Sequence, residues 1–281
     1  MYLTVVVPAR NEEGRISKCI SSVYDAVAEA SLEAEILVVD DASSDHTASE
    51  AAAAGANVIR HLNRLGQLAA WGTGVSESNS DFIVFVDADC IVHKKALNEL
   101  LKGFDDLSVG VVGGRPVALK GSRESLASQS ARFSRKLIDE ICARINNHDF
   151  LAPGALMAVR REAWNVTNTT LPHCDRVVAA AARSAGWVII RESKARVFYK
   201  PSNAYSGVRA DWLRTRFALR SSVSEFDPLP KSVLLAAMVA ATWRSPAGAL
   251  SWAICHTLLT IESRIKRIRS EQQPVFWDPE R

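Results

Sequence analysis

The sequence lacks the cysteine spacings that hold metals or form disulfide frameworks. Its 281 residues include five cysteines, an odd number, with no Cys-x-x-Cys pair among them. The five are Cys19, Cys90, Cys142, Cys174 and Cys255. A disulfide-stapled secreted fold and a cysteine-based zinc site are therefore disfavoured, and a reducing compartment is expected.

A charge excess of either sign is also missing. The 34 Lys and Arg residues nearly balance the 31 Asp and Glu residues, so the net charge is only +3. This balance, together with the lack of any nucleic-acid-binding motif in the sequence, argues against DNA or RNA as a partner.

Glycine is missing from the place where a dinucleotide-binding fold needs it. The first expected strand, near residues 3–7, leads into Pro8-Ala9-Arg10-Asn11. A Rossmann dinucleotide site carries G-x-G-x-x-G at this point, because glycine lets the backbone approach a pyrophosphate closely. The sequence therefore argues against a nicotinamide-dependent dehydrogenase.

No apolar run in the sequence reaches the roughly 20 residues that a membrane-spanning helix needs. The longest candidates, residues 233–243 and 247–261, are separated by Arg244-Ser245-Pro246. Two interpretations stay open: a hairpin that contacts a membrane surface through residues 231–269, or a helical pair packed on the rest of the chain or on a second subunit. The amino-terminal residues do not follow the signal-peptide pattern, so we expect a cytoplasmic protein, peripheral at the inner face of the cell membrane if the hairpin meets lipid.

What the sequence does contain is an alternation of short apolar runs with helical patterns. This order is typical of an α/β fold with a mostly parallel central sheet and flanking helices. The expected strands lie near residues 3–7, 35–40, 57–60, 81–86 and 109–117, and the expected helices near 14–29, 45–54, 65–78, 94–104 and 122–146. The second of these helices is expected to be capped by Ser43-Ser44-Asp45 and to end at Gly55.

The strand near residues 81–86 leads into two carboxylates one residue apart, Asp87 and Asp89. On an alternating strand these two side chains point the same way and Ala88 points away. Hard cations such as Mg²⁺ or Mn²⁺ are held by one or two carboxylates together with phosphate oxygens of a substrate. The motif therefore predicts a divalent-cation site and a phosphate-bearing substrate, with a solvated turn and a capping Asp as the alternative.

The turn after the second strand is acidic as well, with the sequence Asp40-Asp41-Ala42-Ser43-Ser44-Asp45. Ligands of open α/β sheets bind at the carboxyl ends of the strands, so Asp41 is placed to accept hydrogen bonds from a ribose hydroxyl or a base N–H. Alternatively, Asp41 and Asp45 only cap the next helix.

Five segments, in this order and spacing, resemble the family 2 glycosyltransferases of the GT-A fold. They are Val5 to Glu13, Val38 to Thr47, Val86 to Asp89, Gly154 to Arg161, and Cys174-Asp175 followed by Gly186. The resemblance implies a Rossmann-like α/β domain with a helical C-terminal tail. Within it we expect a nucleotide-sugar-binding βα half over residues 1–115, an acceptor-binding and catalytic half over 116–205, and a helical C-terminal region over 206–281.

The resemblance implies an inverting, metal-dependent hexosyl transfer from a nucleotide sugar, most often a UDP-sugar, to a hydroxyl acceptor such as a lipid-linked or envelope glycan. Mn²⁺ or Mg²⁺ is the implied cofactor, with Asp89 as its ligand. Asp175 is the implied general base, which takes the proton from the acceptor hydroxyl. The other residues implied at the donor are Pro8, Arg10, Glu12, Asp41, Arg64, Gln67, Asp87, Ala88 and Arg216, and those on the acceptor side are Gly154, His173 and Cys174.

Four positions depart from the family pattern. Cys174 and Val177 stand where acids are expected, and Gln67 and Gly72 stand in place of a basic residue and an asparagine. Arg64 is a candidate for the missing positive charge. Two alternative functions stay open: a sugar-1-phosphate nucleotidyltransferase, which ordinarily has a glycine-rich basic loop after the first strand, and a non-catalytic nucleotide-sugar-binding protein.

Overall fold

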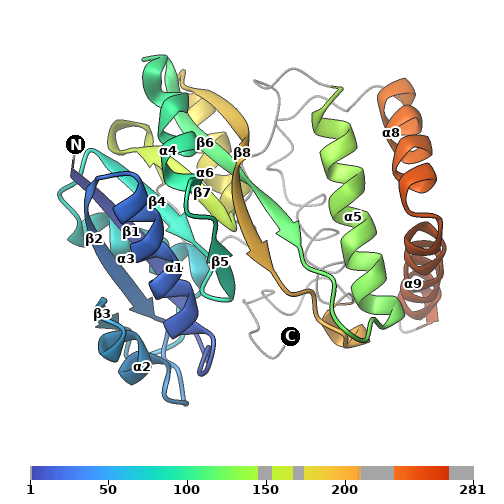
Figure 1. The fold of residues 1–281 in the computed structure, drawn as a ribbon, viewed down its shortest axis with the longest axis horizontal. Helices are drawn as coiled ribbons and strands as arrows, with labels where there is room; N and C mark the ends of the chain where they lie inside the picture. Colours follow the sequence, from blue (N-terminus) through green and yellow to red (C-terminus); the bar gives the residue numbers. More distant parts are fainter. Residues whose placement is uncertain (1, 145–153, 167–173, 208, 210–230, 266–281) are drawn as a thin grey trace. The chain divides into compact units, whose positions relative to one another are not determined.

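The computed structural model describes residues 2–144, 154–166, 174–207, 209 and 231–265. Leaving aside the last six residues, the chain divides into two compact units (Figure 1). The first comprises residues 1–117 and 148–199, and the second comprises residues 118–147 and 200–275. Residues 118–147, which the sequence placed in the acceptor-binding half, thus belong to the same unit as the C-terminal helices.

The first unit is built on a mixed eight-stranded sheet with the strand order β3-β2-β1-β4-β7-β6-β8-β5. Its parallel half consists of β1 (Tyr2–Ala9), β2 (Glu33–Asp40), β3 (Asn57–Arg60) and β4 (Phe82–Val86). All four strands lie where the sequence predicts them. β1 is buried from Leu3 to Ala9, as expected of a parallel strand that is covered on both faces.

Antiparallel pairing dominates the other half of the sheet. Its strands are β5 (Cys90–Val92), β6 (Val109–Ala118), β7 (Leu156–Arg160) and β8 (Val188–Tyr199). β7 pairs with β4 and β6, and β5 pairs with β8. Of these four strands the sequence predicts only β6, so the parallel character that it indicates is confined to the first half.

Helices cover both faces of the sheet. They are α1 (Ile16–Glu29), α2 (Thr47–Ala53), α3 (Gln67–Glu77), α4 (Ala96–Leu101) and α6 (Cys174–Ser184), with 3₁₀ turns η1 (Lys102–Asp105) and η3 (Arg161–Ala163). Val5 and Val7 of β1 belong to the core beneath α1, whereas Val6 faces Gly74 of α3. A Cβ at residue 74 would lie 2.4 Å from Val6 Cγ1. α3 therefore packs this close to the sheet because residue 74 is glycine.

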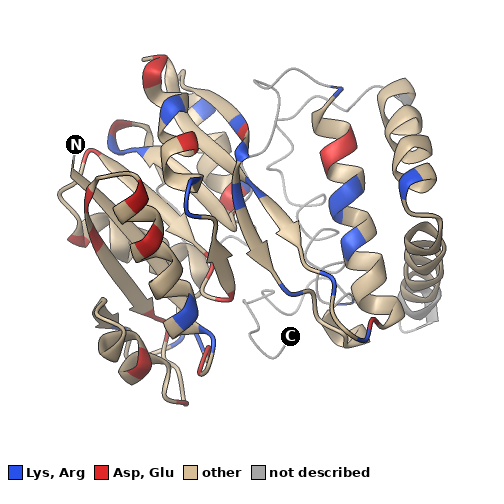
Figure 2. Ribbon diagram, in the orientation of Figure 1, with Lys and Arg blue, Asp and Glu red and all other residues tan. Residues whose placement is uncertain are grey.

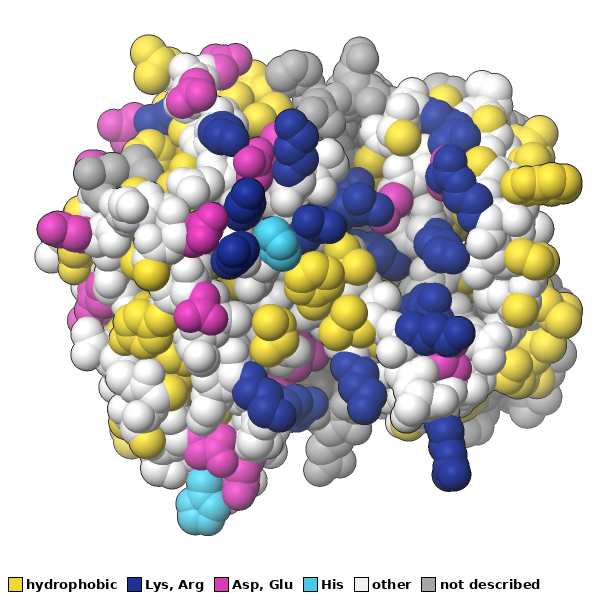
Figure 3. All heavy atoms as spheres, in the orientation of Figure 1, with side chains coloured by type: hydrophobic (Ala, Val, Ile, Leu, Met, Phe, Trp, Pro, Cys, Tyr) yellow, Lys and Arg dark blue, Asp and Glu magenta, His cyan; other side chains and the backbone are white. Residues whose placement is uncertain are grey.

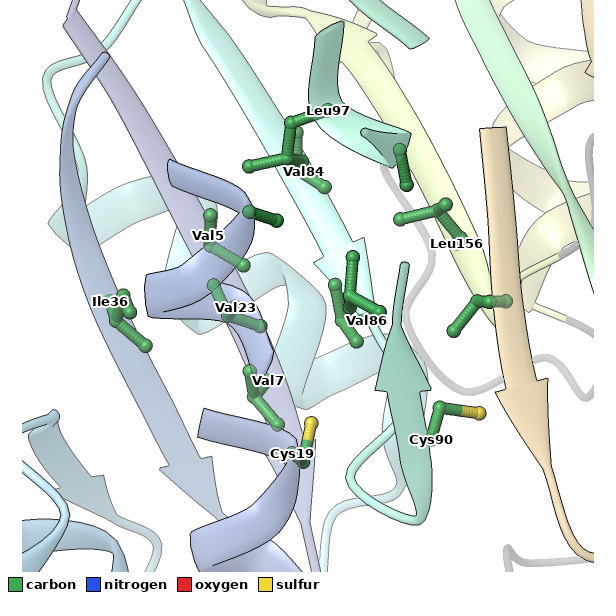
Figure 4. Close-up of a cluster of buried hydrophobic side chains, with 14 of the residues drawn as sticks. Val5, Val7, Cys19, Val23, Ile36, Val84, Val86, Cys90, Leu97 and Leu156 are labelled. Carbon is green, nitrogen blue, oxygen red and sulfur yellow. The ribbon is translucent and has the colours of Figure 1, made fainter. Parts of the chain in front are cut away.

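The core beneath α1 joins the strands that carry the polar turns. Figure 4 shows it as a cluster of aliphatic and cysteine side chains from the sheet and its helices. The labelled members are Val5, Val7, Cys19, Val23, Ile36, Val84, Val86, Cys90, Leu97 and Leu156. Because this core is apolar and buried, it holds the ends of the strands at defined positions.

α2 begins later than the sequence predicts. Its first residue is Thr47, and the preceding His46 makes no side-chain cap. Asp45 Oδ1 instead accepts hydrogen bonds from the Thr47 backbone N–H, at 3.0 Å, and from the Thr47 hydroxyl. The predicted end is confirmed, since Gly55 follows α2 with a φ of 93°, a conformation that glycine adopts without strain.

The described helices of the second unit are α5 (Leu126–Cys142), α8 (Lys231–Arg244) and α9 (Pro246–Ile265). α5 is shorter than predicted and begins after Ser125, whose hydroxyl accepts a hydrogen bond from Ser128 N–H at 3.2 Å. Phe133 of α5 is buried, and its ring centroid lies 5.9 Å from that of Trp252 on α9. α8 and α9 both pack against α5.

In the described part of the chain, no helix is by itself long and apolar enough to cross a membrane. The segments Ser232–Arg244 and Pro246–Thr260 reach the required hydropathy only when they are taken together. The chain bends by 120° between them, at the Arg244-Ser245-Pro246 break seen in the sequence.

Candidate active site

The turns after β1 and β2 are joined to each other by hydrogen bonds. Asn11 N–H donates to Ser43 Oγ at 2.9 Å, and Asn11 Oδ1 accepts from Ser44 N–H at 2.9 Å. Glu12 N–H donates to Thr47 Oγ1 at 2.7 Å. Asn11 has a φ of 52°, a left-handed conformation that asparagine adopts more readily than most residues. The two turns therefore form one connected edge at the carboxyl ends of β1 and β2.

Asp41 anchors the loop that precedes α3. Its Oδ1 accepts a hydrogen bond from Leu65 N–H at 2.7 Å, and its Oδ2 accepts one from Gly66 N–H at 2.8 Å. His61 Nδ1 lies 2.9 Å from Asp41 Oδ1, and His61 Nε2 lies 3.0 Å from Thr73 Oγ1. The Asp41 residue is completely buried, so these partners replace its hydration. The nucleotide contact implied for Asp41 stays a prediction.

Asp87 and Asp89 lie in a tight turn between β4 and β5. β4 ends at Val86, and Cys90 N–H closes the turn by donating to Asp87 O at 3.1 Å. The sequence predicted that Asp87 and Asp89 point the same way because they alternate along a strand, and this reason is wrong. The turn itself brings the ligand atoms together, because a carboxylate oxygen of Asp87, one of Asp89 and Cys90 Sγ all lie within 4.8 Å of one another.

This donor set fits a hard divalent cation. Asp89 is exposed and Asp87 is half-buried. Cys90 Sγ donates to Asp89 Oδ1 at 3.4 Å, and burial, with the charges of Asp89 and Asp87, raises the pKa of the Cys90 thiol well above its usual value. The carboxylate oxygens of Asp87 and Asp89 are the hard donors of this set, and oxygen donors suit Mg²⁺ or Mn²⁺.

Gln67, the first residue of α3, connects two parts of the chain that are far apart in sequence. Its Nε2 donates to Asp87 Oδ1 at 2.8 Å, and its Oε1 accepts from Cys174 Sγ at 3.6 Å. Cys174 is buried and is the first residue of α6. An amide can donate and accept at the same time, whereas a basic residue at this position could only donate. Gln67 thus links the carboxylate turn after β4 with the start of α6.

Asp175, the second residue of α6, lies close to the strand that leads into this turn. It is half-buried, and its Oδ1 accepts from Arg176 N–H at 2.9 Å. Trp71 of α3 is buried and stacks on Phe85 of β4, with ring centroids 4.5 Å apart. A Cβ on Gly154 would lie 3.2 Å from Trp71 Cη2 and 3.4 Å from Asp175 Cβ. Gly154 therefore stands between Trp71 and Asp175, where a larger residue would push them apart.

Glu12 is a buried carboxyl within electrostatic reach of the same turn. Burial raises the pKa of Glu12 to about 8, with Arg15 opposing the shift and Asp89 and Asp87 adding to it. Arg15 Nε lies 2.8 Å from Glu12 Oε2. Near neutral pH, Glu12 therefore keeps its proton in most molecules and adds little negative charge to the site.

The raised pKa of Glu12 predicts a pH-dependent stability difference for Glu12→Gln. Between the unfolded value of 4.5 and the folded value of about 8, the native state holds a proton that the unfolded state releases. The contribution of the Glu12 proton to the free energy of unfolding is complete below the pKa of the unfolded state. It is lost as pH rises to the pKa of the folded state, by up to about 1.4 kcal/mol per pH unit. Glutamine has no proton to release, so the melting temperature of Glu12→Gln relative to wild type should be higher at about pH 8 than at about pH 5.

The measurement is thermal unfolding in EDTA, so that no cation changes the charge of the site. Glu13→Gln is the matched control, because Glu13 is the exposed neighbour of Glu12. The same pH trend in both variants would contradict the assignment of the effect to burial.

Comparison with known proteins decides the family. The model described as glycosyl transferase family 2 matches residues 4–166, which is more than half of the chain. The chain belongs to glycosyl transferase family 2. The matched segment includes the turns after β1, β2 and β4 and also Gly154, but it ends before α6.

The relatives of this family 2 chain share only part of its length. Glycosyltransferase AglE from Haloferax volcanii is 30% identical over 118 residues, which is 40% of this chain and 38% of that protein. The chain thus spans well under half of the length of this curated relative.

Solved structures confirm the predicted GT-A fold class for this family 2 chain. A mannosyltransferase from Pyrobaculum calidifontis, in complex with GDP-Man and Mn²⁺, aligns with a TM-score of 0.61 at 20% identity, over 95% of this chain and 81% of that one. Glucosyl-3-phosphoglycerate synthase from Mycobacterium tuberculosis, in complex with Mn²⁺, UDP-Glc and phosphoglyceric acid, aligns with a TM-score of 0.54 at 19% identity, over 81% of each chain. At these identities the likeness establishes the fold alone.

Most residues that the sequence singles out in this family 2 chain fall into one connected set. Asp41 binds Gly66, whose neighbour Gln67 binds Asp87 and Cys174. The set also includes Arg10, whose Nη1 donates to Asp41 O at 3.2 Å, together with Glu12, Ala88, Asp89, Gly154 and Asp175. Pro8 is buried within β1 and Arg64 is half-buried in the loop after β3. His173 and Arg216 lie outside the described residues.

Two residues of this site were not identified from the sequence of the family 2 chain. His61 follows β3 directly and orients Asp41, so the same carboxyl-end rule that indicated Asp41 would have found it. Trp71 reads as an ordinary apolar residue of α3. Its buried Nε1 has no hydrogen-bond acceptor among the described residues, which marks it as a donor available beside Asp175 and Gly154.

Proposed function

We propose that this chain is an inverting glycosyltransferase that moves a sugar from a nucleotide donor to a hydroxyl acceptor. UDP-sugars are the first candidate donors. One observation carries the proposal: the amide of Gln67 bonds both Asp87 and Cys174, so the carboxylate turn and the start of α6 belong to one site. Family membership supports sugar transfer as the reaction class.

Asp89 and Asp87 are the residues that hold Mn²⁺ or Mg²⁺ in this proposal. When bound, the cation neutralises the negative charge that builds on the departing nucleoside diphosphate. Gln67 keeps the Asp87 carboxylate oriented through its N–H. Burial raises the pKa of Glu12, which reduces the negative charge that this carboxyl adds beside a diphosphate.

Asp175 is the proposed general base. In an inverting transfer the acceptor oxygen attacks the anomeric carbon from the face opposite the diphosphate. The bond from that carbon to the diphosphate breaks as the new C–O bond forms, and the acceptor proton passes to the base. Asp175 suits this role because it is a carboxylate one residue from the Gln67 bridge and close to Gly154.

The donor class is proposed from the sequence pattern and from the structural relatives. The two solved structures named above contain GDP-Man and UDP-Glc respectively, so both nucleotides belong in a binding screen. UDP-sugars are tested first because the family that the sequence resembles most often uses them as donors.

Binding and turnover of nucleotide sugars by the full chain test the proposal. We expect one of UDP-glucose, UDP-galactose, UDP-N-acetylglucosamine and GDP-mannose to raise the melting temperature in Mn²⁺ and not in EDTA. A ligand that binds only the folded state stabilises it by about 2.7 kcal/mol at a hundred times its dissociation constant. The same donor should slowly release nucleoside diphosphate, with water as the acceptor.

Other outcomes would decide for the alternatives. Pyrophosphorolysis of the nucleotide sugar, in which pyrophosphate displaces sugar 1-phosphate and yields the nucleoside triphosphate, would indicate a sugar-1-phosphate nucleotidyltransferase. Metal-dependent binding without turnover would indicate a non-catalytic nucleotide-sugar-binding protein. If no donor in the panel stabilised the chain with or without Mn²⁺, the proposed function would be wrong.

A further inference from the structure

α8 is packed with its small residues inward and its large apolar residues outward. Ala237 and Ala241 are completely buried. Leu235, Val239 and Trp243 are 67%, 61% and 88% exposed, and because they are four residues apart they form one stripe along the helix. A helix on a soluble protein normally turns such a stripe toward the core. α8 therefore presents its largest apolar side chains to its surroundings.

α9 repeats this arrangement. Leu250, Ile254 and Leu258, again four residues apart, are 64%, 37% and 50% exposed, whereas Ser251 and Cys255 are buried. Figure 3 shows yellow, apolar side chains gathered at the right of the view, where Figure 1 labels α8 and α9. Exposed apolar side chains gathered along two successive helices mark an interaction site.

The unit that carries this surface is strongly basic. Residues 118–147 and 200–275 contain 17 of the 34 Lys and Arg residues but only 8 of the 31 Asp and Glu residues, which gives these segments a net charge of +9 in a chain of net charge +3. Figure 2 shows several of these basic residues along the α5 ribbon, and Figure 3 shows dark blue side chains over the same part of the view. From Ser232 to Thr260, by contrast, Arg244 is the only charged residue.

Arg244 lies at the border between the apolar and basic surfaces. Arg244 and Arg144 both pair with the buried carboxylate of Glu140 on α5, so the three side chains together remain positive. A shallow groove of about 710 Å³ is lined by both arginines and by apolar residues that include Leu235 and Trp243. Positive charge therefore borders the apolar stripe of α8 directly.

We propose that α8 and α9 lie in the surface of an anionic lipid bilayer. The apolar stripes enter the boundary between headgroups and acyl chains, and the basic residues of the unit face the anionic headgroups. α8 has 14 residues and α9 has 20, with a bend of 120° between them. A spanning helix needs about 20 apolar residues in line, and neither helix by itself is long and apolar enough, so a position within the surface suits this pair of helices.

A bilayer fits this surface better than a second copy of the chain does. Two copies that met through α8 and α9 would bring together two units that each carry the excess of positive charge described above, and like charges across an interface oppose association. An anionic bilayer instead supplies the opposite charge over the whole contact. If the proposed function holds, this surface also brings the chain to where lipid-linked acceptors reside.

Flotation of the full chain with lipid vesicles tests the inference. We expect binding to vesicles that contain phosphatidylglycerol, and binding weaker by about tenfold or more to pure phosphatidylcholine or in high salt. The double substitution Leu235→Gln with Trp243→Ser should weaken binding to the anionic vesicles by about tenfold or more, because it removes apolar surface that enters the bilayer. Both side chains are exposed, so the melting temperature should stay near that of wild type.

Leu107→Gln is the matched control, since Leu107 is 79% exposed but lies in the first unit; it should bind vesicles as wild type does. Failure of wild type to bind anionic vesicles, or equal binding by the double variant, would overturn the inference. A dimer in solution that the double variant dissociates, with no vesicle binding, would assign the surface to a second copy. The assay needs neither donor nor metal, so its outcome is independent of sugar transfer.

Discussion

Asp89→Asn is expected to lower metal-dependent release of nucleoside diphosphate by about 10³-fold. Asparagine keeps the size of the side chain but removes the negative charge that makes a carboxylate a strong ligand of a hard cation. Asp89 is exposed in the turn between β4 and β5, so the melting temperature without metal should not change. The measurement is steady-state diphosphate release over a Mn²⁺ titration, with the donor that the binding screen identifies.

The control for this substitution is Asp105→Asn, which removes an exposed carboxylate of η1, away from the turn. It should leave both turnover and the Mn²⁺ dependence of donor binding unchanged. Asp89→Asn should instead lose the part of the donor-induced melting shift that depends on Mn²⁺. Wild-type turnover of Asp89→Asn at the same Mn²⁺ concentration would show that the cation is held elsewhere.

Asp175→Asn is expected to reduce transfer by about 10²–10⁴-fold, the usual contribution of a general base, while the affinity for the nucleotide donor is retained. Asparagine preserves the shape beside Gly154 and Trp71, but it cannot take the acceptor proton. The measurement pairs donor binding by thermal shift with diphosphate release.

Glu162→Gln is the matched control, because Glu162 is an exposed acid of η3 in the same unit. It should behave as wild type in both assays. An unchanged rate in Asp175→Asn would rule out Asp175 as the base. Loss of donor binding together with turnover would assign Asp175 to donor positioning instead.

The parallel half of the sheet was predictable because its central strands are continuous apolar runs between turn signals. β1 and β4 are buried on both faces, and burial of this kind leaves a direct trace in the sequence. β5 has only three residues, and β8 mixes charged with apolar residues because part of it is exposed. Neither strand forms a run that differs from a loop, so both were missed.

The candidate site also has one part that could be predicted from the sequence and one part that could not. Asp87 and Asp89 stand out because two carboxylates follow an apolar strand, although the turn that joins them was read as strand. The bond between Gln67 and Cys174 joins residues 107 positions apart, and no local pattern in a single sequence reports such a contact. The sequence marks each of the two residues only as a departure from the family pattern, and the contact between them appears only in the folded chain.

The hydrogen bonds that tie Asn11 and Glu12 to the turn after β2 have a consequence for how a donor is received. Two loops that are fastened together in this way have few alternative conformations to give up when a ligand arrives. The entropic penalty of association is then small at this edge, and more of the contact energy remains as affinity. Substitutions at Ser43 or Thr47 that remove these hydrogen bonds should therefore lower the affinity for the donor.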